Sequence, residues 1–290
     1  MAHGTFQVGD LTAVIGDNAA HEKHRKGYNG LWSLKHKTGS RSIFVPGIAG
    51  LNLEHIFDGG SIEDRDVFFE PRVAPMQYRK ISDSEAELHQ PPTPTYRLES
   101  WTRFKLRAPH YIDMTFRCRA TQHAFKQDWI GLFWASYINA PLDKSIYFRG
   151  GWPNRLGLWS QLVSQEHNDE CTILHRDDKK ALNYDPGRDA LFKNYSRMVY
   201  EEPFYYGNFE DHTWITMFDR PEEVRFTHSP SGGGTNKLLQ TTNPAWDFQW
   251  IIPDYEVNTD YTLRIRAVLR ERCSREKIQQ EFKDWDPQGA

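Results

Sequence analysis

The segment GLNLEHIFDGG, residues 50–60, places a glutamate beside a histidine in an otherwise apolar run. Successive side chains of an extended strand point to opposite faces, so Glu54 and His55 are not expected to contact each other. We expect His55 to share the apolar face with Leu53 and Phe57, as a buried and hydrogen-bonded histidine. Glu54 would then lie on the polar face, where a carboxylate can act as a general base or accept hydrogen bonds from hydroxyl groups. Glu54 is therefore a catalytic candidate.

Two further segments supply acid/base candidates. His123 precedes the aromatic segment DWIGLFWASYI, and its imidazole could protonate a ring or glycosidic oxygen because it titrates near neutrality. Glu202 lies with Tyr206 in EEPFYYGNFEDH, where carboxylates adjoin aromatic rings. A sugar needs acceptors for its hydroxyls and a flat apolar partner for its CH faces. The alternatives are a solvated loop histidine and an ordinary acidic surface loop.

Other residues are candidates for positioning a substrate. Arg72, in FEPRVAP, could hold a hydroxyl or a uronate carboxylate, or could form a structural ion pair. In NPAWDFQW, Asp247 and Gln249 fall on one strand face and could bind vicinal hydroxyls, whereas Trp246 points into the core. The predicted substrate-binding residues are Arg72, Trp134, Tyr206, Asp247 and Gln249.

Two segments resemble metal- or phosphate-binding motifs, but neither has the spacing of a known motif. HEKH places His21 and His24 together, but this is not the HExxH zinc signature and a distant ligand would have to complete the set. The sequence identifies no cofactor with certainty, and a divalent metal remains an alternative, with His21, His24 and His123 as its candidate ligands. SPSGGGTNK, residues 229–237, lacks the GxxxxGK[ST] spacing, so we expect a glycine-rich loop over a cleft.

Strand patterns dominate the segments that must position these residues. YIDMTFRCRA and YTLRIRAVLR alternate apolar and polar side chains, as half-buried strands do. Weaker strand patterns, separated by Gly, Pro, Asn and Asp, occur in TAVIG, GLWSLKH, SIFVPG, AELHQ, RLESWTRFKLRA, WIGLFWASYI, SIYFRGG, WITMFD, VRFTH and FQWIIP. One amphipathic helix is predicted over residues 274–285, with Ser274 as its cap. We therefore predict an all-β protein, one large antiparallel β-sandwich domain over residues 1–290 with this helix packed outside it.

Composition excludes several classes of partner. The 36 basic and 39 acidic residues give a net charge of −3, which argues against nucleic acid and anionic membranes as partners. The sequence has no signal-peptide pattern and no run approaching the roughly 20 apolar residues that span a bilayer, so we expect a cytoplasmic protein. The three cysteines are widely spaced, which predicts neither a disulfide framework nor a zinc knuckle.

The order of segments resembles that of the galactose mutarotase-like (aldose 1-epimerase) superfamily, from about residue 30 to residue 269. AELHQPPTPTYRLESWTRFKLRAPHYIDMTFRCRAT leads into DWIGLFWASYINAPLDKSIYFRGG, and NPAWDFQWIIPDYEVNTDYTLRIRAVL follows near the end. The resemblance implies a β-sandwich with a sugar site on a concave face, where a histidine acts as general acid and a glutamate as general base without a cofactor. Here FWASYINAP has no histidine at the corresponding place, and NPAWDFQW offers Asp247 in place of glutamate.

The function predicted from the sequence is acid/base chemistry on a sugar ring or glycoside, with a mono- or oligosaccharide as ligand. An epimerase or mutarotase-like isomerase, a lyase and a hydrolase all remain open, with Glu54, His123 and Glu202 as the catalytic set. The alternatives are a non-catalytic carbohydrate-binding or sensor protein of the same fold and a sandwich with no small ligand. The absence of the histidine favours the first of these alternatives. The sequence leaves the oligomeric state open.

Overall fold

Alternating side chains build the strands, as the sequence predicts. The computed structural model describes all residues except 1, 167–168, 187–191, 231–242 and 289–290, so most of the glycine-rich segment 229–237 lies outside the described residues. The described strands are β1 (His3–Val8), β2 (Leu11–Gly16), β3 (Gly30–His36), β4 (Asn52–Phe57), β5 (Gln77–Ser82), β6 (Glu85–Gln90), β7 (Leu98–Arg107), β8 (Tyr111–Ala120), β9 (Trp129–Ala135), β10 (Ile146–Trp152), β11 (Arg155–Leu162), β12 (Thr172–His175), β13 (Tyr195–Phe209), β14 (His212–Phe218), β15 (Val224–Ser229), β16 (Ala245–Pro253) and β17 (Tyr261–Glu271). The helices are α1 (Arg65–Phe68), α2 (Glu70–Val73) and α3 (Arg275–Asp284).

Most of these strands belong to one sheet. β1, β2 and β3 form a small sheet of their own. The large sheet has 14 strands in the order β4-β9-β16-β15-β12-β13-β14-β17-β8-β7-β6-β5, and β10 and β11 branch from β13. Its pairs are antiparallel except β12 with β13. The all-β, mostly antiparallel architecture is thus confirmed.

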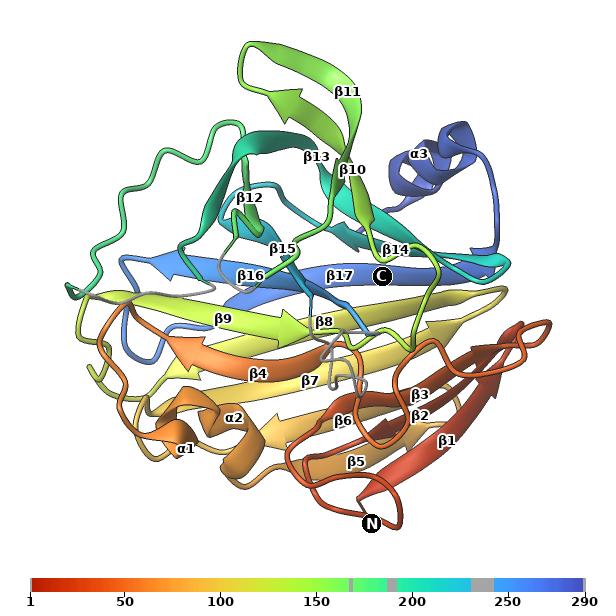
Figure 1. The fold of residues 1–290 in the computed structure, drawn as a ribbon. Coiled ribbons are helices and arrows are strands. Elements are labelled where there is room, and N and C mark those ends of the chain that lie inside the picture. Colours follow the sequence, from red (N-terminus) through yellow and green to blue (C-terminus); the bar gives the residue numbers. More distant parts are fainter. Residues whose placement is uncertain (1, 167–168, 187–191, 231–242, 289–290) are drawn as a thin grey trace.

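The large sheet folds over on itself and encloses the main apolar core. We call β4, β9, β16, β15 and β12 its front half, and β14, β17, β8, β7, β6 and β5 its back half (Figure 1). Rings from the two halves meet in this core: Trp134 of β9 packs edge-on against Phe116 of β8 with centroids 4.8 Å apart, and Phe248 of β16 lies 4.9 Å from Phe218 of β14. The outward face of the front half carries the polar residues described below.

The C-terminal helix is confirmed over nearly the predicted range. Ser274 caps α3, because its hydroxyl accepts a hydrogen bond from the backbone N–H of Lys277. Ile278 and Trp285 pack with β13, β14 and β17 in an apolar cluster separate from the main core. No helix in the described part of the chain is long and apolar enough to cross a membrane.

Some elements differ from the prediction. SIFVPG is not a strand, because it contributes only an isolated bridge between Phe44 and Ile138. Residues 154–200, which contain none of the strand patterns named above, hold β11, β12 and the start of β13. The short helices α1 and α2, which lie beside β4 in Figure 1, have too few turns to show a helical period in the sequence.

Candidate functional site

A β-bulge in β4 brings Glu54 and His55 together, contrary to the prediction that they cannot contact each other. Leu53 pairs with Trp134 and His55 with Phe133, so Glu54 is an extra residue between two consecutive pairs of the ladder. The bulge breaks the strict alternation, and His55 Nε2 lies 3.6 Å from Glu54 Oε2. It also corrects the predicted face, because Leu53 lies in the main core and His55 does not. His55 is nevertheless buried and hydrogen-bonded, through Nδ1 to Phe68 O at 2.5 Å.

One oxygen of Glu54 is fixed from two sides. Arg72 Nη1, from α2, donates to Glu54 Oε1 at 2.8 Å, and the hydroxyl of Tyr137, just after β9, donates to the same oxygen. Arg72 Nε also donates to Gly27 O, and its guanidinium lies 4.0 Å from the Tyr28 ring centroid. Burial, reinforced by the charge of Glu54, holds the pKa of Tyr137 well above its usual value, so this hydroxyl keeps its proton and remains a donor.

The other oxygen of Glu54 remains available. Among the described residues, Oε2 has only His55 Nε2 near it, at 3.6 Å, beyond hydrogen-bond reach. A carboxylate with one oxygen anchored and the other unbonded is suited to accept a proton or a hydroxyl hydrogen bond. Its side chain is only 7% exposed, so its environment is largely shielded from water.

Asp247 of β16 is a second buried carboxyl group, two strands away from Glu54 in the order β4-β9-β16. Its Oδ1 accepts a hydrogen bond from the backbone N–H of Ser136 at 2.9 Å, and in the described part of the chain Oδ2 has no hydrogen-bond partner. Complete burial, and secondarily the charge of Glu54, raise the pKa of Asp247 well above its usual range. Burial thus favours the protonated form of Asp247, whereas Glu54 forms an ion pair with Arg72. An acid and a base in one site require environments that differ in this way.

These carboxyl groups belong to a buried polar row on the outward face of the front half. In the ladder Asp247 is opposite Thr227 and Gln249 is opposite Arg225, and Thr227 is in turn opposite Thr172 of β12. The intervening residues, such as Phe248, enter the main core. The polar row consists of Glu54, Asp247, Gln249, Thr227, Thr172 and Arg225.

Gln249 is the best-placed neutral group of the row. It is fully buried, and its Nε2 donates to Thr227 Oγ1 at 3.0 Å and to Thr172 Oγ1 at 3.4 Å. Its Oε1 has no partner among the described residues, and neither has Nδ2 of the buried Asn52 nearby on β4. Buried polar atoms are normally hydrogen-bonded, so these two orphan atoms indicate a polar ligand or water on this face.

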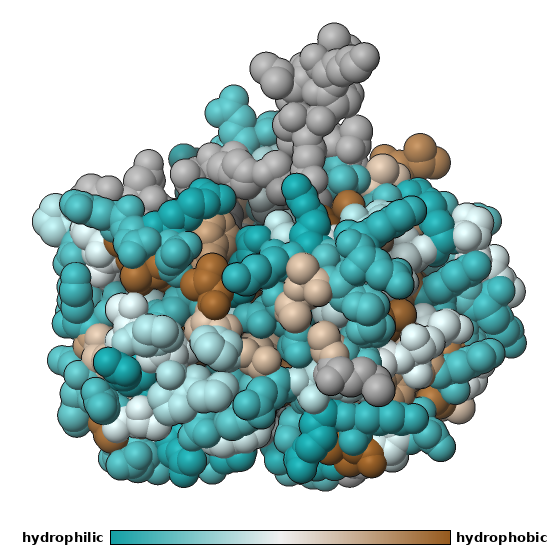
Figure 2. Space-filling view, turned by 90° about the horizontal axis from the view of Figure 1, so that it is seen from below, coloured by the Kyte–Doolittle hydropathy of each residue, from teal (hydrophilic) through white to brown (hydrophobic). Residues whose placement is uncertain are grey.

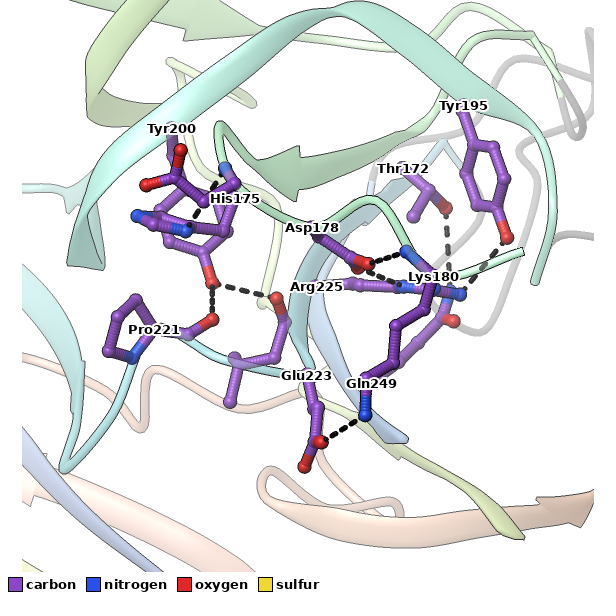
Figure 3. Close-up of polar contacts among 12 residues, drawn as sticks. Thr172, His175, Asp178, Lys180, Tyr195, Tyr200, Pro221, Glu223, Arg225 and Gln249 are labelled. Atoms are coloured by element: carbon purple, nitrogen blue, oxygen red, sulfur yellow. Dashed lines mark hydrogen bonds and ion pairs between the residues drawn. The ribbon is translucent and has the colours of Figure 1, made fainter. Parts of the chain in front are cut away.

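Arg225 closes the other end of the row (Figure 3). Its side chain is 1% exposed, and its Nε donates to Asp178 Oδ2 at 3.2 Å while Nη1 donates to the Tyr195 hydroxyl at 3.0 Å. Asp178 also accepts from the backbone N–H of Lys180, whose ammonium is paired with Glu223. This network fastens the segment after β12 over the sheet, and it compensates the buried guanidinium charge.

The structure brings four of the predicted residues into this row or its contacts and adds others that were missed. Glu54, Asp247 and Gln249 lie in the row, and Arg72 binds it. Tyr137, Arg225 and Asp178 were not predicted as site residues. The alternation of VRFTH, with Val224 and Phe226 facing inward, places Arg225 on the outward face of its strand. It does not show that this strand pairs with the one that carries Asp247 and Gln249.

Glu202 and Tyr206 lie elsewhere. Both are on β13 beneath α3: Gln279 Nε2 donates to the Glu202 carboxylate at 2.9 Å, and Arg275 Nε donates to the Tyr206 hydroxyl at 2.9 Å. The Tyr206 ring stacks on Tyr147 with centroids 5.1 Å apart. These contacts dock the C-terminal helix, and they keep both residues apart from the Glu54 carboxylate.

His123 and Trp134 are also separated from Glu54. The exposed ring of His123 lies in the loop before β9, with its centroid 5.9 Å from that of Tyr255. Trp134 is fully buried and stacks on Phe248 at 4.9 Å inside the main core, because its position in β9 alternates with Phe133 on the outward face. Its ring has no surface to offer a sugar there.

The candidate metal ligands do not form a complete set. His21 and His24 pair with each other through the backbone, the His24 ring stacks 3.7 Å from Trp32, and His24 Nε2 bonds to Tyr28 O. His123 lies apart from both of them in the fold. Within the described ranges, no three His, Cys, Asp or Glu side chains are placed to hold a metal ion together.

Comparison with known proteins places the fold. No known protein family and no curated protein matches the sequence. Solved structures do match: an aldose epimerase homologue from C. elegans (TM-score 0.53, 8% identity, 94% of this chain and 100% of that one), a galactose mutarotase related enzyme from Lactobacillus acidophilus (0.51, 9%, 93% and 97%) and a galactose mutarotase-like protein from Lactobacillus casei (0.51, 10%, 92% and 100%). The chain therefore has the galactose mutarotase-like fold, remote in sequence from these structures, as the order of its segments indicates.

Proposed function

We propose that the protein is a carbohydrate-active enzyme whose acid/base pair is Glu54 and Asp247. The observation that carries the proposal is the pair itself: two buried carboxyl groups on the outward face of the front half, each with one oxygen anchored and one unbonded among the described residues, and close enough for Glu54 to raise the pKa of Asp247. In a ring-opening reaction Glu54 Oε2 would take the proton of the anomeric hydroxyl while Asp247 gives its proton to the ring oxygen. The C–O ring bond breaks, a carbonyl forms, and the reverse steps close the ring.

The charges of the polar row support a neutral sugar as substrate. Arg72 is paired with Glu54 and Arg225 with Asp178, and burial favours the neutral form of Asp247, so the row together with Arg72 and Asp178 holds no unpaired cation. A phosphate or uronate would bring in a buried negative charge without a free cation to meet it, which is costly. Gln249 Oε1 and Asn52 Nδ2 instead offer one acceptor and one donor, which suit hydroxyl groups.

Non-catalytic sugar binding is the second candidate function. It is favoured by the placement of His55, the one imidazole beside Glu54 in the described part of the chain, because its Nδ1 is committed to Phe68 O. A sensor or binding protein would use the same hydroxyl-binding atoms without turnover.

The test is interconversion of sugar anomers, measured by two-dimensional exchange NMR on a panel of neutral aldoses, with a uronate and a sugar phosphate for comparison. We expect Glu54→Gln and Asp247→Asn each to slow the reaction about 10²- to 10⁴-fold, the usual contribution of a general acid or base. Glu281→Gln is the matched control, because Glu281 is also buried and bound by an arginine and a tyrosine, but it belongs to α3 and lies on the back half of the sheet.

His123→Ala and Glu202→Gln test the catalytic set that the sequence suggests, and we expect both to keep the wild-type rate. Binding of a neutral sugar without exchange would favour the non-catalytic candidate. Equal losses in Glu54→Gln and Glu281→Gln, or neither binding nor exchange with any sugar, would contradict a site at the polar row.

A further inference from the structure

The edge strands of the large sheet differ in how they are protected from pairing with another chain. In the described part of the chain the sheet ends at β4, at β5 and, through its branch, at β11. Helix α2 packs on β4, and its Arg72 binds Glu54. β5 carries Arg79 and Lys80, which are exposed and paired with Glu87 and Asp83. Helix cover and edge charges are the usual means by which proteins prevent strands from pairing with other chains.

Figure 2 shows the side of the molecule near β5, seen from below. Hydrophilic side chains cover most of it, and apolar residues form small separate patches. This side therefore offers no continuous apolar surface to another chain.

β11 has neither kind of protection. It pairs only with β10, and residues 156–163, LGLWSQLV, contain no charged residue and no proline. Outside this ladder, the one main-chain group of β11 with a partner among the described residues is the N–H of Gly157, which donates to Glu201 Oε2 at 2.5 Å. The outward N–H and C=O groups of the strand are thus available for pairing.

The hairpin β10–β11 also carries much of the exposed apolar surface. It projects from the body of the protein at the top of Figure 1. Trp152 is 48% exposed, Leu158 37% and Val163, just after β11, 39%, which makes three of the six large exposed apolar residues in the described part. A groove of about 360 Å³ continues from the end of β11, lined in part by Leu162, Val163 and Met198.

We propose that a second copy of this chain covers the edge of β11, with the two β11 strands pairing antiparallel across a two-fold axis. A two-fold contact requires only that one surface complement itself. Residues 156–162 of β11 are uncharged, and in an antiparallel pair Arg155 at the start of one strand lies opposite the far end of the other, so like charges do not oppose each other. The main-chain donors and acceptors of one edge match those of the other. Because the hairpin projects, two copies can bring these edges together without contact between their bodies.

The experiment is sedimentation equilibrium of the full chain over a concentration series, with 34.0 kDa as the monomer mass. We expect reversible dimers in the micromolar range, because one strand pair with a few apolar side chains buries less than the roughly 1,600 Å² of a standard interface. Leu158→Lys places two like charges across the contact and should raise the dimer dissociation constant about tenfold or more. Leu142→Lys is the control, because Leu142 is a fully exposed leucine in the loop between β9 and β10.

Amide hydrogen exchange locates the contact. Exchange in residues 155–162 should slow as the protein concentration rises, whereas exchange in the charged edge strand β5 should not change. A wild-type protein that stays monomeric at about 100 μM, or a dimer that Leu158→Lys leaves unaltered, would overturn the proposal. Neither outcome bears on the acid/base pair, which is tested separately by sugar exchange in monomer or dimer.

Discussion

Two buried glutamates of this protein are each bound by one arginine and one tyrosine. Glu54 is bound by Arg72 and Tyr137 on the front half of the sheet, and Glu281 of α3 is bound by Arg270 and Tyr111 on the back half. Both glutamate side chains are 7% exposed, and their arginines are 16% and 19% exposed. Composition and burial therefore do not distinguish the two groups.

The difference lies in how the two oxygens of each carboxylate are used. Glu281 receives Arg270 on Oε1 and Tyr111 on Oε2, the latter at 2.9 Å, so both of its oxygens are bonded. Glu54 receives both donors on Oε1, which leaves Oε2 facing its neighbours. The first arrangement docks a helix, and the second leaves an oxygen for a ligand. A buried Glu-Arg-Tyr group is thus no site by itself, and the free oxygen and a neighbouring acid are what make it a candidate.

Removal of each arginine should give the largest effect and separate the two groups. Arg72→Leu leaves the Glu54 carboxylate buried beside Asp247 without its cation, and we expect a loss of about 3–5 kcal/mol in the free energy of unfolding. Arg270→Leu should cost roughly half as much, because α3 is a terminal helix and can release Glu281 into water by local opening. Urea unfolding of both variants measures the difference. An Arg270→Leu loss as large as that of Arg72→Leu would contradict the distinction.

The pH dependence of stability should sharpen the contrast through Asp247. Burial and the nearby Glu54 hold the pKa of Asp247 well above its usual range in the folded protein, whereas the unfolded chain returns to about 3.9. From about pH 4 up to the folded pKa the native state holds a proton that the unfolded chain has lost, so stability falls as pH rises. Asparagine does not ionise. Asp247→Asn should therefore gain stability relative to wild type by at most about 1.4 kcal/mol per pH unit.

Thermal or urea unfolding of both proteins from pH 5 to pH 8 checks this slope. The Glu54→Gln background is the matched control, since it removes the second cause of the raised pKa of Asp247 and should shorten the pH window from its upper end. A stability difference that stays constant with pH, or that shrinks as pH rises, would show that Asp247 is ionised in the folded protein.

Local alternation was enough to predict much of the fold. β8 and β17 keep a two-residue burial period along most of their length, and the same period correctly placed Asp247 and Gln249 on one face of β16 with Trp246 on the other. Ser274 correctly marked the start of α3. These features depend on the direction of side chains within a single strand or helix, and that direction follows from the order of residues alone.

The geometry of the candidate site depends on contacts between strands that are far apart in the sequence. The bulge at Glu54 is defined by the pairing of β4 with β9, so the alternation rule assigned Glu54 and His55 to opposite faces. Glu202 and His123 had suitable chemistry, but the sheet order sends them beneath α3 and beside Tyr255. Conversely, Arg225 meets Asp178 only because β12 lies next to β15. Long-range neighbours are set by strand order, and the local period carries no information about that order.

Loss of the tyrosine hydroxyls should give the smallest effects, and it tests the comparison most directly. Tyr137→Phe removes a buried donor to Glu54, and we expect a loss of about 1.5–3 kcal/mol, the range for a hydrogen bond to a charged group. Tyr111 is partly exposed, although burial and Glu281 raise its pKa to about 12, so water can replace its hydroxyl on Glu281 Oε2. Tyr111→Phe should therefore cost less than about 1 kcal/mol.

Sugar exchange provides a second readout for the same two variants. Tyr137→Phe frees Glu54 to rotate about its single remaining anchor, Arg72, and should lower the exchange rate more than it lowers substrate affinity, because orientation of the base matters most in the transition state. Tyr111→Phe should leave both quantities unchanged, since Glu281 holds only the C-terminal helix. If the two variants had equal effects on stability and on exchange, then the free oxygen of Glu54 would not be what separates a ligand site from a helix dock.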